Sequence, residues 1–367
     1  MHGEQPITNR LLEESGTGKV LLTGRRYQVW DGKFGESDLF GNGWSDLLEA
    51  LKSLKEDIDM AQFLQQNFPR DRHADLHRKV QAFAEGYDGA TLNQVSALAL
   101  REEWSRNDED HQYRIEGGYS RLIDFLERSV RASGGEVKLS SPVQHIAWSR
   151  GRVEVHFGPN VVTGSRVVIT VPVGVMQKGA ITFSPAIPEY SDAYRNIGFG
   201  GVVKMFATFR TPFWESQGRR VSDMAFLFSD APIPTWWTSD RSSARLTGWL
   251  AGPRVNAHLD RDVLRSRALT SLAYVMDCTE EQIASELRHW DLINWAADPF
   301  ACGAYAYPTT KTAAALKVLQ EPLEETLYFA GEGLYHGSAI GTVEAALDSG
   351  EGCARRLLSA LKDEARP

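Results

Sequence analysis

Apolar residues recur at helical spacing between residues 43 and 104. In "WSDLLEALKSLKEDIDMAQFLQQNF" the large apolar side chains lie near one stripe of a helix, and "DLHRKVQAFAEGY" repeats this pattern. The whole segment is therefore predicted to be mostly helical. The polar stretch "SRNDEDHQY", at about 105–113, follows it and is interpreted as a boundary between structural units.

The centre of the chain has the pattern of a helix followed by strands. Gly117 and Gly118 predict a turn into a helix within "YSRLIDFLERSV". Beyond it, runs of apolar, β-branched or alternating residues predict strands, and helical periodicity returns later. The predicted elements are strands at 136–140, 143–149, 152–157, 166–176 with its end at Pro172, and 200–209, a β region at 222–250, and helices at 260–276 and 279–287.

The segment "YFAGEGLYHGSAIGTVEAALDSGEG" combines the end of a strand, several glycines and the start of a helix. Its first three residues complete a short apolar run, and Gly341-Thr342 opens a helix of small residues from about Val343 to Ser359. A strand that ends in glycines and leads into a helix N-terminus brings backbone N–H groups toward an anionic or electron-rich ligand. The alternative is a helix that is only packed through its small residues.

Length and composition are those of a globular protein with more than one domain. The 367 residues exceed one typical hydrophobic core, so two intertwined or sequential domains are predicted. A net charge of −8, without a basic cluster, argues against nucleic acid as a partner. The three cysteines are widely separated and the nine histidines lack metal-ligand spacing, so neither a disulfide framework nor a metal site is predicted.

Neither a membrane span nor a signal peptide is predicted. No apolar run approaches the roughly 18 residues that a span needs, and "MHGEQPITNRLLEE" is polar from its second residue. No membrane partner is therefore expected, and the cytoplasm is the default location for the sequence as it stands.

The segment "EESGTGKVLL" (13–22) has the glycines and the lysine of a phosphate-binding loop but not its spacing. It lacks the first glycine at the required offset and the Ser or Thr after Lys19, and it follows a predicted helix rather than a strand. We interpret it as a plain turn.

Five stretches occur along the chain in the order and style of one family. They are "YRIEGGYSRLIDFLERSV", "VITVPVGVM" with "ITFSP" after it, "VVKMFATFRTPFW", "WAADPFACGAYAYP" and "LYFAGEGLYHGSAIGTVEAALDSGEGCARRLL". The chain thereby resembles the flavin-dependent amine oxidases, the group of monoamine, polyamine and L-amino-acid oxidases. The resemblance extends from about residue 1 to 360.

The resemblance implies that FAD binds around the C-terminal glycine segment. In the family this segment approaches the flavin, and the helix begins beside the pyrimidine edge of the ring. Reduced flavin is negatively charged there, and a helix N-terminus contributes about half a positive charge. The residues implied near the flavin are Gly331, Gly341, Thr342, Val343 and Pro172, and Glu332 is implied at the ribityl or pyrophosphate part. Val143 is implied at the adenine. Trp295 is implied against the flavin ring, with a purely structural tryptophan as the alternative.

Lys204 is the catalytic lysine that the resemblance implies. It stands in "GGVVKMFATF", where alternation alone would favour a lysine on a solvated strand face. The match of "VVKMF" and "PFW" to the family's lysine strand implies that Lys204 holds a water against flavin N5 and assists the reaction of reduced flavin with oxygen. Desolvation would lower its pKa, and a positive charge there would favour this reaction.

Two more residues resemble catalytic positions of the family. Tyr305, in "GAYAYP", matches the tyrosine on the substrate side of the flavin, a core aromatic being the alternative, and His2 matches the histidine near the substrate amine in polyamine-type members. Thr342 stands where many members carry a second aromatic, so the aromatic cage is incomplete. Ala304 stands where some members carry a cysteine bonded to FAD and Cys302 is out of register, so noncovalent FAD is expected.

One part of the family pattern is absent from the sequence. Members begin with a β-α-β unit whose G-x-G-x-x-G loop holds the FAD pyrophosphate, and no such motif occurs here. About the first 50 to 70 residues of a usual member are therefore expected to be missing. Three explanations stay open: a truncated sequence, a degenerate member, or a partner that supplies the unit, such as a separate N-terminal polypeptide. A homo-oligomer is also considered.

The predicted fold class is α/β plus α+β, in the two-domain FAD-oxidoreductase arrangement. Residues 113–180 and 318–367 are expected to form an incomplete doubly wound FAD-binding domain. Residues 4–112 and 181–317 are expected to form a substrate domain in which a sheet is flanked by helices.

The predicted function is FAD-dependent oxidation of a monoamine, polyamine or amino acid by oxygen. Hydride transfer from the α-carbon to flavin leaves an imine that water hydrolyses, and oxygen is reduced to hydrogen peroxide. One alternative is another flavin enzyme, such as a desaturase or a protoporphyrinogen-type oxidase, against which Lys204 and "GAYAY" argue. The other is a truncated, split or non-catalytic homologue that cannot hold FAD alone. No Ser-His-Asp or Cys-His motif supports hydrolysis.

Overall fold

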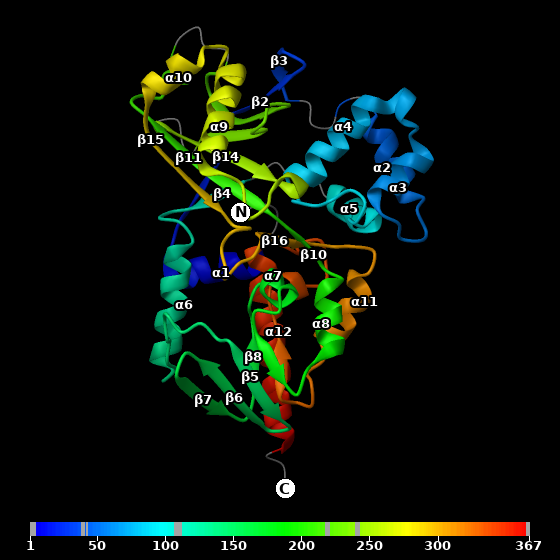
Figure 1. Cartoon of the computed structure of the whole chain (residues 1–367), viewed down its shortest axis with the longest axis vertical. Coiled ribbons are helices and arrows are strands. Elements are labelled where there is room, and N and C mark those ends of the chain that lie inside the picture. Colours follow the sequence, from blue (N-terminus) through cyan, green and yellow to red (C-terminus); the bar gives the residue numbers. More distant parts are fainter. Residues whose placement is uncertain are drawn as a thin grey trace. The chain divides into compact units, whose positions relative to one another are not determined.

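The chain forms two compact units, each drawn from separate parts of the sequence (Figure 1). This computed structural model describes residues 5–37, 41, 43–105, 112–216, 221–238 and 243–364. The first unit comprises Met1–Leu21, Glu102–Gly198 and Tyr305–Pro367, and the second comprises Leu22–Arg101 and Phe199–Ala304. The two predicted domains divide the chain at other points, and their roles stay predictions.

The first unit combines helices with short sheets. A four-stranded sheet has the order β7-β6-β5-β9, β8 pairs with β17 in parallel, and β1 pairs with β4 in antiparallel orientation. Its helices are α1 (Pro6–Ser15), α6 (Ser120–Ala132), α7 (Val173–Gln177), α8 (Pro188–Arg195), α11 (Thr312–Leu319) and α12 (Val343–Glu364), with a 3-10 turn η4 (Glu332–Leu334). Its strands are β1 (Lys19–Leu21), β4 (Tyr113–Ile115), β5 (His145–Ser149), β6 (Arg152–Phe157), β7 (Asn160–Gly164), β8 (Val167–Ile169), β9 (Thr182–Ser184), β16 (Tyr305–Tyr307) and β17 (Leu327–Phe329).

The parallel pair β8 and β17 positions two loops side by side. Ile169 pairs with Phe329, so both strands end at the same edge of the pair. Phe329 is buried and its ring stacks on Tyr190 of α8 at 5.0 Å between centroids. The loops that follow the carboxyl ends of parallel strands are where ligands commonly bind in such sheets. Here these loops lead to Pro172 and Gly331.

A buried carboxylate of α12 caps α1, which lies more than three hundred residues away in the sequence. Glu344 accepts hydrogen bonds from the backbone N–H groups of Ile7 and Thr8, each at 2.8 Å, and from the Thr8 hydroxyl at 2.6 Å. These N–H groups belong to the first turn of α1 and have no acceptor within that helix. The carboxylate therefore fixes the start of α1 against the start of α12.

The second unit is built on a seven-stranded sheet of order β15-β11-β14-β13-β12-β2-β3. Its strands are β2 (Arg25–Trp30), β3 (Lys33–Glu36), β11 (Val202–Phe209), β12 (Met224–Ser229), β13 (Thr235–Thr238), β14 (Arg245–Ala251) and β15 (Leu287–Asn294), and β10 (Gly198–Gly200) crosses from the first unit. Its helices are α2 (Trp44–Lys52), α3 (Met60–Asn67), α4 (Arg70–Gly86), α5 (Ala97–Trp104), α9 (Arg261–Met276) and α10 (Glu280–Glu286), with 3-10 turns η2 (Phe213–Glu215) and η3 (Gly252–Arg254).

The core of the second unit follows the alternation of β11. Val203 and Met205 are fully buried in one cluster with Leu264 and Leu272 of α9. Because successive strand side chains point to opposite faces, Lys204 lies on the other face of the sheet.

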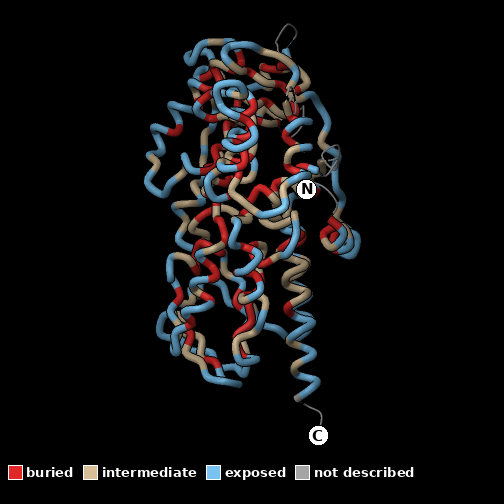
Figure 2. Tube along the Cα trace, turned by 90° about the vertical axis from the view of Figure 1, so that its right-hand side faces the viewer, coloured by how far each residue is buried: buried red, intermediate tan, exposed pale blue. Residues whose placement is uncertain are grey.

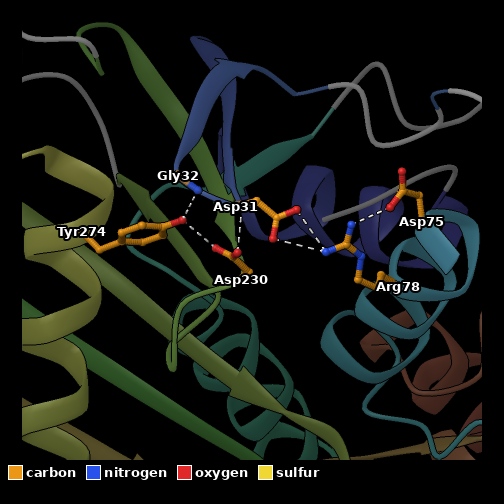
Figure 3. A network of polar contacts seen from close by, with 6 residues as sticks. All are labelled: Asp31, Gly32, Asp75, Arg78, Asp230 and Tyr274. Atoms are coloured by element: carbon orange, nitrogen blue, oxygen red, sulfur yellow. Dashed lines mark hydrogen bonds and ion pairs between the residues drawn. The ribbon is translucent and has the colours of Figure 1, made fainter.

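A surface network joins the β2–β3 turn to two helices of the second unit (Figure 3). Arg78 of α4 approaches the Asp31 carboxylate at 3.1 Å, and the Asp31 N–H donates to Asp230 at 2.9 Å. The Tyr274 hydroxyl of α9 donates to Asp230 at 2.9 Å and accepts from the Gly32 N–H at 2.8 Å. Exposed ion pairs contribute at most about 1 kcal/mol each, so this network orients the turn more than it stabilises the unit.

Most of the predicted elements are confirmed, and one strand is wrong. The helical region 43–104 and the strand within 200–209 are present, as α2 to α5 and β11. Residues 136–140 form no strand, because no described segment pairs with them, and Leu139 is 78% exposed. A strand without a hydrogen-bonded neighbour is not stable in water.

Two further boundaries differ from the sequence expectation. The strand expected at 166–176 ends at Ile169, and Val173–Gln177 is helical with Pro172 as its N-cap. Proline has no N–H to donate to a strand ladder, so it does not continue the strand. The predicted C-terminal helix extends beyond Ser359 to Glu364. Its last turns are mostly exposed (Figure 2), and two apolar residues there, Leu358 and Leu361, are among the exposed ones.

Candidate functional site

Gly331 follows β17 and leaves open space beside the backbone. Its φ is 149°, a conformation that side chains rarely adopt, and a Cβ placed there would meet no atom within 4 Å. Its N–H donates to the Ser349 hydroxyl of α12 at 3.1 Å. The position is thus held by α12 while one side of the backbone is clear, as a close approach to a ligand requires.

Glu332 ties three segments of the first unit together. Its carboxylate accepts a hydrogen bond from the Ala306 N–H of β16 at 3.2 Å and another from the backbone of Gly341. Burial raises the pKa of Glu332 to about 7, and these two hydrogen bonds oppose the rise. A side chain of η4 therefore holds β16 beside the turn that precedes α12.

Gly341 fits tightly against β16. Its φ is 84°, and a Cβ there would lie 2.7 Å from the Ala306 carbonyl oxygen and 3.5 Å from Tyr305 Cδ2. The turn before α12 and the strand that carries Tyr305 are thus in direct contact. Two of the predicted site residues, Gly341 and Tyr305, are brought together by this packing.

The N-terminus of α12 is capped by Thr342. Its hydroxyl accepts from the Ala345 N–H at 3.2 Å and donates to the Ala339 carbonyl at 2.6 Å. The N–H groups of Val343 and Glu344 lie too early in the helix to have an acceptor within it. Val343 is 40% exposed. This helix end therefore presents donors and a partial positive charge, which suit an anionic or electron-rich group.

Pro172 belongs to the same cluster through its neighbour Val173. A Cβ on Gly333 would lie 2.4 Å from Val173 Cγ2, so only glycine allows η4 to approach α7 this closely. Val143 is half-buried in the segment before β5, which belongs to a different sheet from β8 and β17. The structure thus groups Pro172, but not Val143, with the glycine segment.

Two further predicted residues, Lys204 and Trp295, belong to the second unit. Lys204 is half-buried, and its Nζ lies 5.7 Å from the ring centroids of both Phe206 and Trp237. Trp295 is 37% exposed, and its backbone N–H donates to the Val202 carbonyl at 3.0 Å. Lys204 therefore does not stand on a freely solvated strand face. His2 lies outside the described residues.

Sequence reasoning missed the residues that connect the site. The Ala306 backbone and Gly333 carry no side-chain chemistry, and only the spacing of glycines in "GEGL" could have drawn attention to Gly333. The pairing of Glu344 with α1 had no sequence signal.

The described residues contain no group of acidic, histidine or cysteine side chains able to hold a metal ion, and the three cysteines, all in the described part, form no disulfide. No described helix has both the length and the apolarity of a membrane span.

Glu332 should make the stability of the protein depend on pH. Its pKa in the folded state, about 7, exceeds the ordinary value of 4.5, so folding is favoured below about pH 4.5 and this contribution is lost as the pH rises through 7. We expect Glu332→Gln to remove at least about 2 kcal/mol of the stability change between roughly pH 4 and 8. Urea unfolding at both pH values measures this, with Glu49→Gln, at an exposed carboxylate of α2, as the control. Equal pH dependence in Glu332→Gln and wild type would contradict the assignment.

The parallel pair with its two loops and the glycine-rich approach to a helix N-terminus are features of enzymes that bind a nucleotide cofactor. The sequence profile of the family described as "Flavin containing amine oxidoreductase" matches residues 28–358. The chain belongs to this family. The match includes both the Lys204 strand and the Gly341 helix.

Solved structures of two amine oxidases have a similar fold. Putrescine oxidase, wild type and bound to putrescine, superimposes with a TM-score of 0.77 at 17% identity, covering 98% of this chain and 87% of that chain. Cyclohexylamine oxidase from Brevibacterium oxydans gives 0.77 at 16% identity with the same coverage. These structures confirm the predicted fold class, and the match over residues 28–358 confirms the predicted family.

Curated relatives match only part of their own length. Lysine-specific histone demethylase 1B of Mus musculus is 26% identical over 66% of this chain and 30% of the relative. Polyamine oxidase 3 of Oryza sativa subsp. japonica is 23% identical over 84% of this chain and 64% of the relative. The chain thus spans less than two thirds of the length of these relatives.

Proposed function

We propose that this chain takes part in the FAD-dependent oxidation of an amine to an imine, with oxygen reduced to hydrogen peroxide. The observation that carries the proposal is the family match over residues 28–358, which includes the strand of Lys204 and the helix of Gly341. The relatives and similar structures include several amine oxidases, which supports the reaction class.

The first unit offers a donor set that fits FAD. The start of α12, from Gly341 through Thr342 to Val343, supplies N–H groups for the electron-rich edge of the ring. The clear side of Gly331 accommodates a close neighbour, and Glu332 keeps β16 and Gly341 in register. Pro172, Val143 and Trp295 are proposed to contact FAD at the flavin, the adenine and the ring, and its binding is proposed to be noncovalent.

When bound, FAD accepts a hydride equivalent from the carbon beside the amine nitrogen and passes two electrons to oxygen. Lys204 is proposed to hold a water and to stabilise negative charge that develops during the oxygen reaction, because its ammonium is partly shielded from solvent by two rings. Tyr305 and His2 are proposed to orient the amine. No side-chain base is needed if the amine arrives unprotonated.

The names of several relatives suggest a second class of substrate, a lysine side chain within a protein. Lysine-specific histone demethylases act on lysine within a protein, and they match this chain at 26% and 27% identity. A lysine side chain presented by a polypeptide is therefore kept as a second candidate, beside a small free amine. We also propose a cytoplasmic location and a partner polypeptide that supplies the N-terminal β-α-β unit.

The test is anaerobic reduction of the flavin. Protein supplied with FAD and purified from the excess is mixed with amines without oxygen, and the loss of flavin absorbance is followed. We expect bleaching by at least one amine, and release of hydrogen peroxide after oxygen is admitted. Retention of FAD without bleaching by any free or peptidyl amine would reject the proposed reaction.

A further inference from the structure

One face of the second unit's sheet is covered with aromatic side chains. Phe206, Phe226, Phe228, Trp237 and Trp249 occupy alternate positions on four strands, and we call them the aromatic face. Phe226 pairs directly with Trp237 across β12 and β13, and Trp249 pairs directly with Lys204 across β14 and β11. Directly opposed residues of an antiparallel pair share one face of the sheet.

The rings of the aromatic face contact one another. The Trp237 and Trp249 centroids are 5.8 Å apart, Phe226 and Trp237 are 6.3 Å apart, and Phe226 stacks on Phe228 at 6.0 Å. The Trp249 N–H donates to the Gly86 carbonyl at the end of α4 at 2.8 Å. All five rings are half-buried. The face is therefore preorganised and apolar, and part of it remains accessible.

Among the described strand residues of this face, basic side chains outnumber carboxylates. Lys204 lies over Phe206 and Trp237, and Arg26 of β2 pairs with Phe226. Among the described strand residues that share the face, Asp291 is the one carboxylate, placed opposite Phe206 at the edge of the sheet. It is already bound to Arg261, with 2.6 Å between Nη2 and Oδ1.

This charge pattern discriminates between classes of amine. A second ammonium group on a substrate would have to leave water, and the one carboxylate among the described strand residues of this face, Asp291, is already bound to Arg261. This transfer is unfavourable. Aromatic rings attract cations, but Lys204 already lies over two of these rings and would repel another ammonium group. An aryl or cycloalkyl group, in contrast, gains contact area from the rings.

Resting on the proposed function, we infer that the aromatic face binds the carbon skeleton of an amine with a single nitrogen and an aryl or cycloalkyl group, and that it disfavours diamines and polyamines. Trp237 is the specificity-determining residue, because it contacts the ammonium of Lys204 and two other rings of the face.

The first experiment compares cyclohexylamine with putrescine on the FAD-loaded protein. We expect anaerobic flavin reduction to favour cyclohexylamine at least about tenfold in second-order rate constant, which corresponds to about 1.4 kcal/mol. Trp237→Ala should lower the value for cyclohexylamine about tenfold and leave that for putrescine within about twofold. Phe300→Ala, which removes a ring that is 67% exposed and outside this face, is the matched control.

A second readout does not depend on turnover. Binding of each amine to the protein without FAD is followed by tryptophan fluorescence, which Trp237 and Trp249 should report. Cyclohexylamine should quench the signal at lower concentration than putrescine, and Trp237→Phe should retain this order. If Trp237→Ala does not fold, as judged by thermal unfolding, Trp237→Leu takes its place.

A third variant tests the charge argument. Phe228→Glu places a carboxylate on the same face, opposite the uncharged Thr235 and Gln28, and should shift the preference toward putrescine by at least about tenfold. Preference of the wild type for putrescine or for a methylated-lysine peptide would overturn the inference. Equal losses for both amines in Trp237→Ala, or an unchanged preference in Phe228→Glu, would also overturn it. Failure of every amine to reduce bound FAD would instead reject the proposed reaction, and the fluorescence titration would still decide which amine the face binds.

Discussion

Replacing Gly341 with alanine should destabilise the protein by about 4 kcal/mol. A φ of 84° costs an L-residue roughly 1–2 kcal/mol, and the new Cβ would lie 2.7 Å from the Ala306 carbonyl oxygen. A backbone atom cannot rotate away as a side chain can, so β16 would have to move, at a further cost of about 1–3 kcal/mol. Urea unfolding of Gly341→Ala and wild type measures the difference.

Gly134 provides a matched control for the steric part of this effect. Its φ is 83°, almost that of Gly341, but a Cβ there would meet nothing within 4 Å. Gly134→Ala should therefore cost only the conformational term of roughly 1–2 kcal/mol. Equal losses in the two variants would show that the contact between Gly341 and β16 is unimportant. A larger loss in Gly341→Ala would also be expected to weaken FAD retention, since the same turn opens α12.

Replacing Lys204 with methionine should slow the reaction of reduced flavin with oxygen by about 100-fold, while anaerobic reduction by amine changes by less than about threefold. Methionine keeps the length and apolar contacts of the side chain over Phe206 and Trp237 but removes the positive charge. Stopped-flow absorbance of the two half-reactions in the FAD-loaded protein separates these effects.

Lys33→Met is the control for a general loss of charge, because Lys33 belongs to β3 at the far edge of the same sheet. It should leave both half-reactions within about twofold of wild type. If Lys204→Met also leaves the oxygen reaction unchanged, Lys204 has no part in it. A loss of amine reduction alone would place Lys204 at the substrate instead.

The local pattern of the sequence was sufficient for most of the elements. Alternation in "VVKMFATF" predicted β11, and the helical spacing of apolar residues predicted the region 43–104. Such periodicities reflect which side of an element is buried, and this property is local. The family motifs were also recognisable from short stretches, because their glycines and their lysine stand at fixed offsets within each stretch.

Only the tertiary structure showed which other elements each strand pairs with and which face of the sheet is buried. Residues 136–140 have the composition of a strand, but a strand forms only beside a partner, and no described segment provides one. Alternation placed Lys204 on the other face of the strand from Val203 and Met205. It could not show which face is buried in the core, or that Trp249 pairs with Lys204 across β14 and β11.

The contacts that assemble the candidate site join residues far apart in the chain. Glu332 meets Ala306 across 26 residues, and Glu344 caps Thr8 across 336. A hydrogen bond of this kind depends on the positions of whole elements, and a free backbone N–H has no residue-specific signal in the sequence. The types of residue at the site were therefore legible from the chain alone, whereas their partners, their burial and the raised pKa of Glu332 arise only when the elements pack.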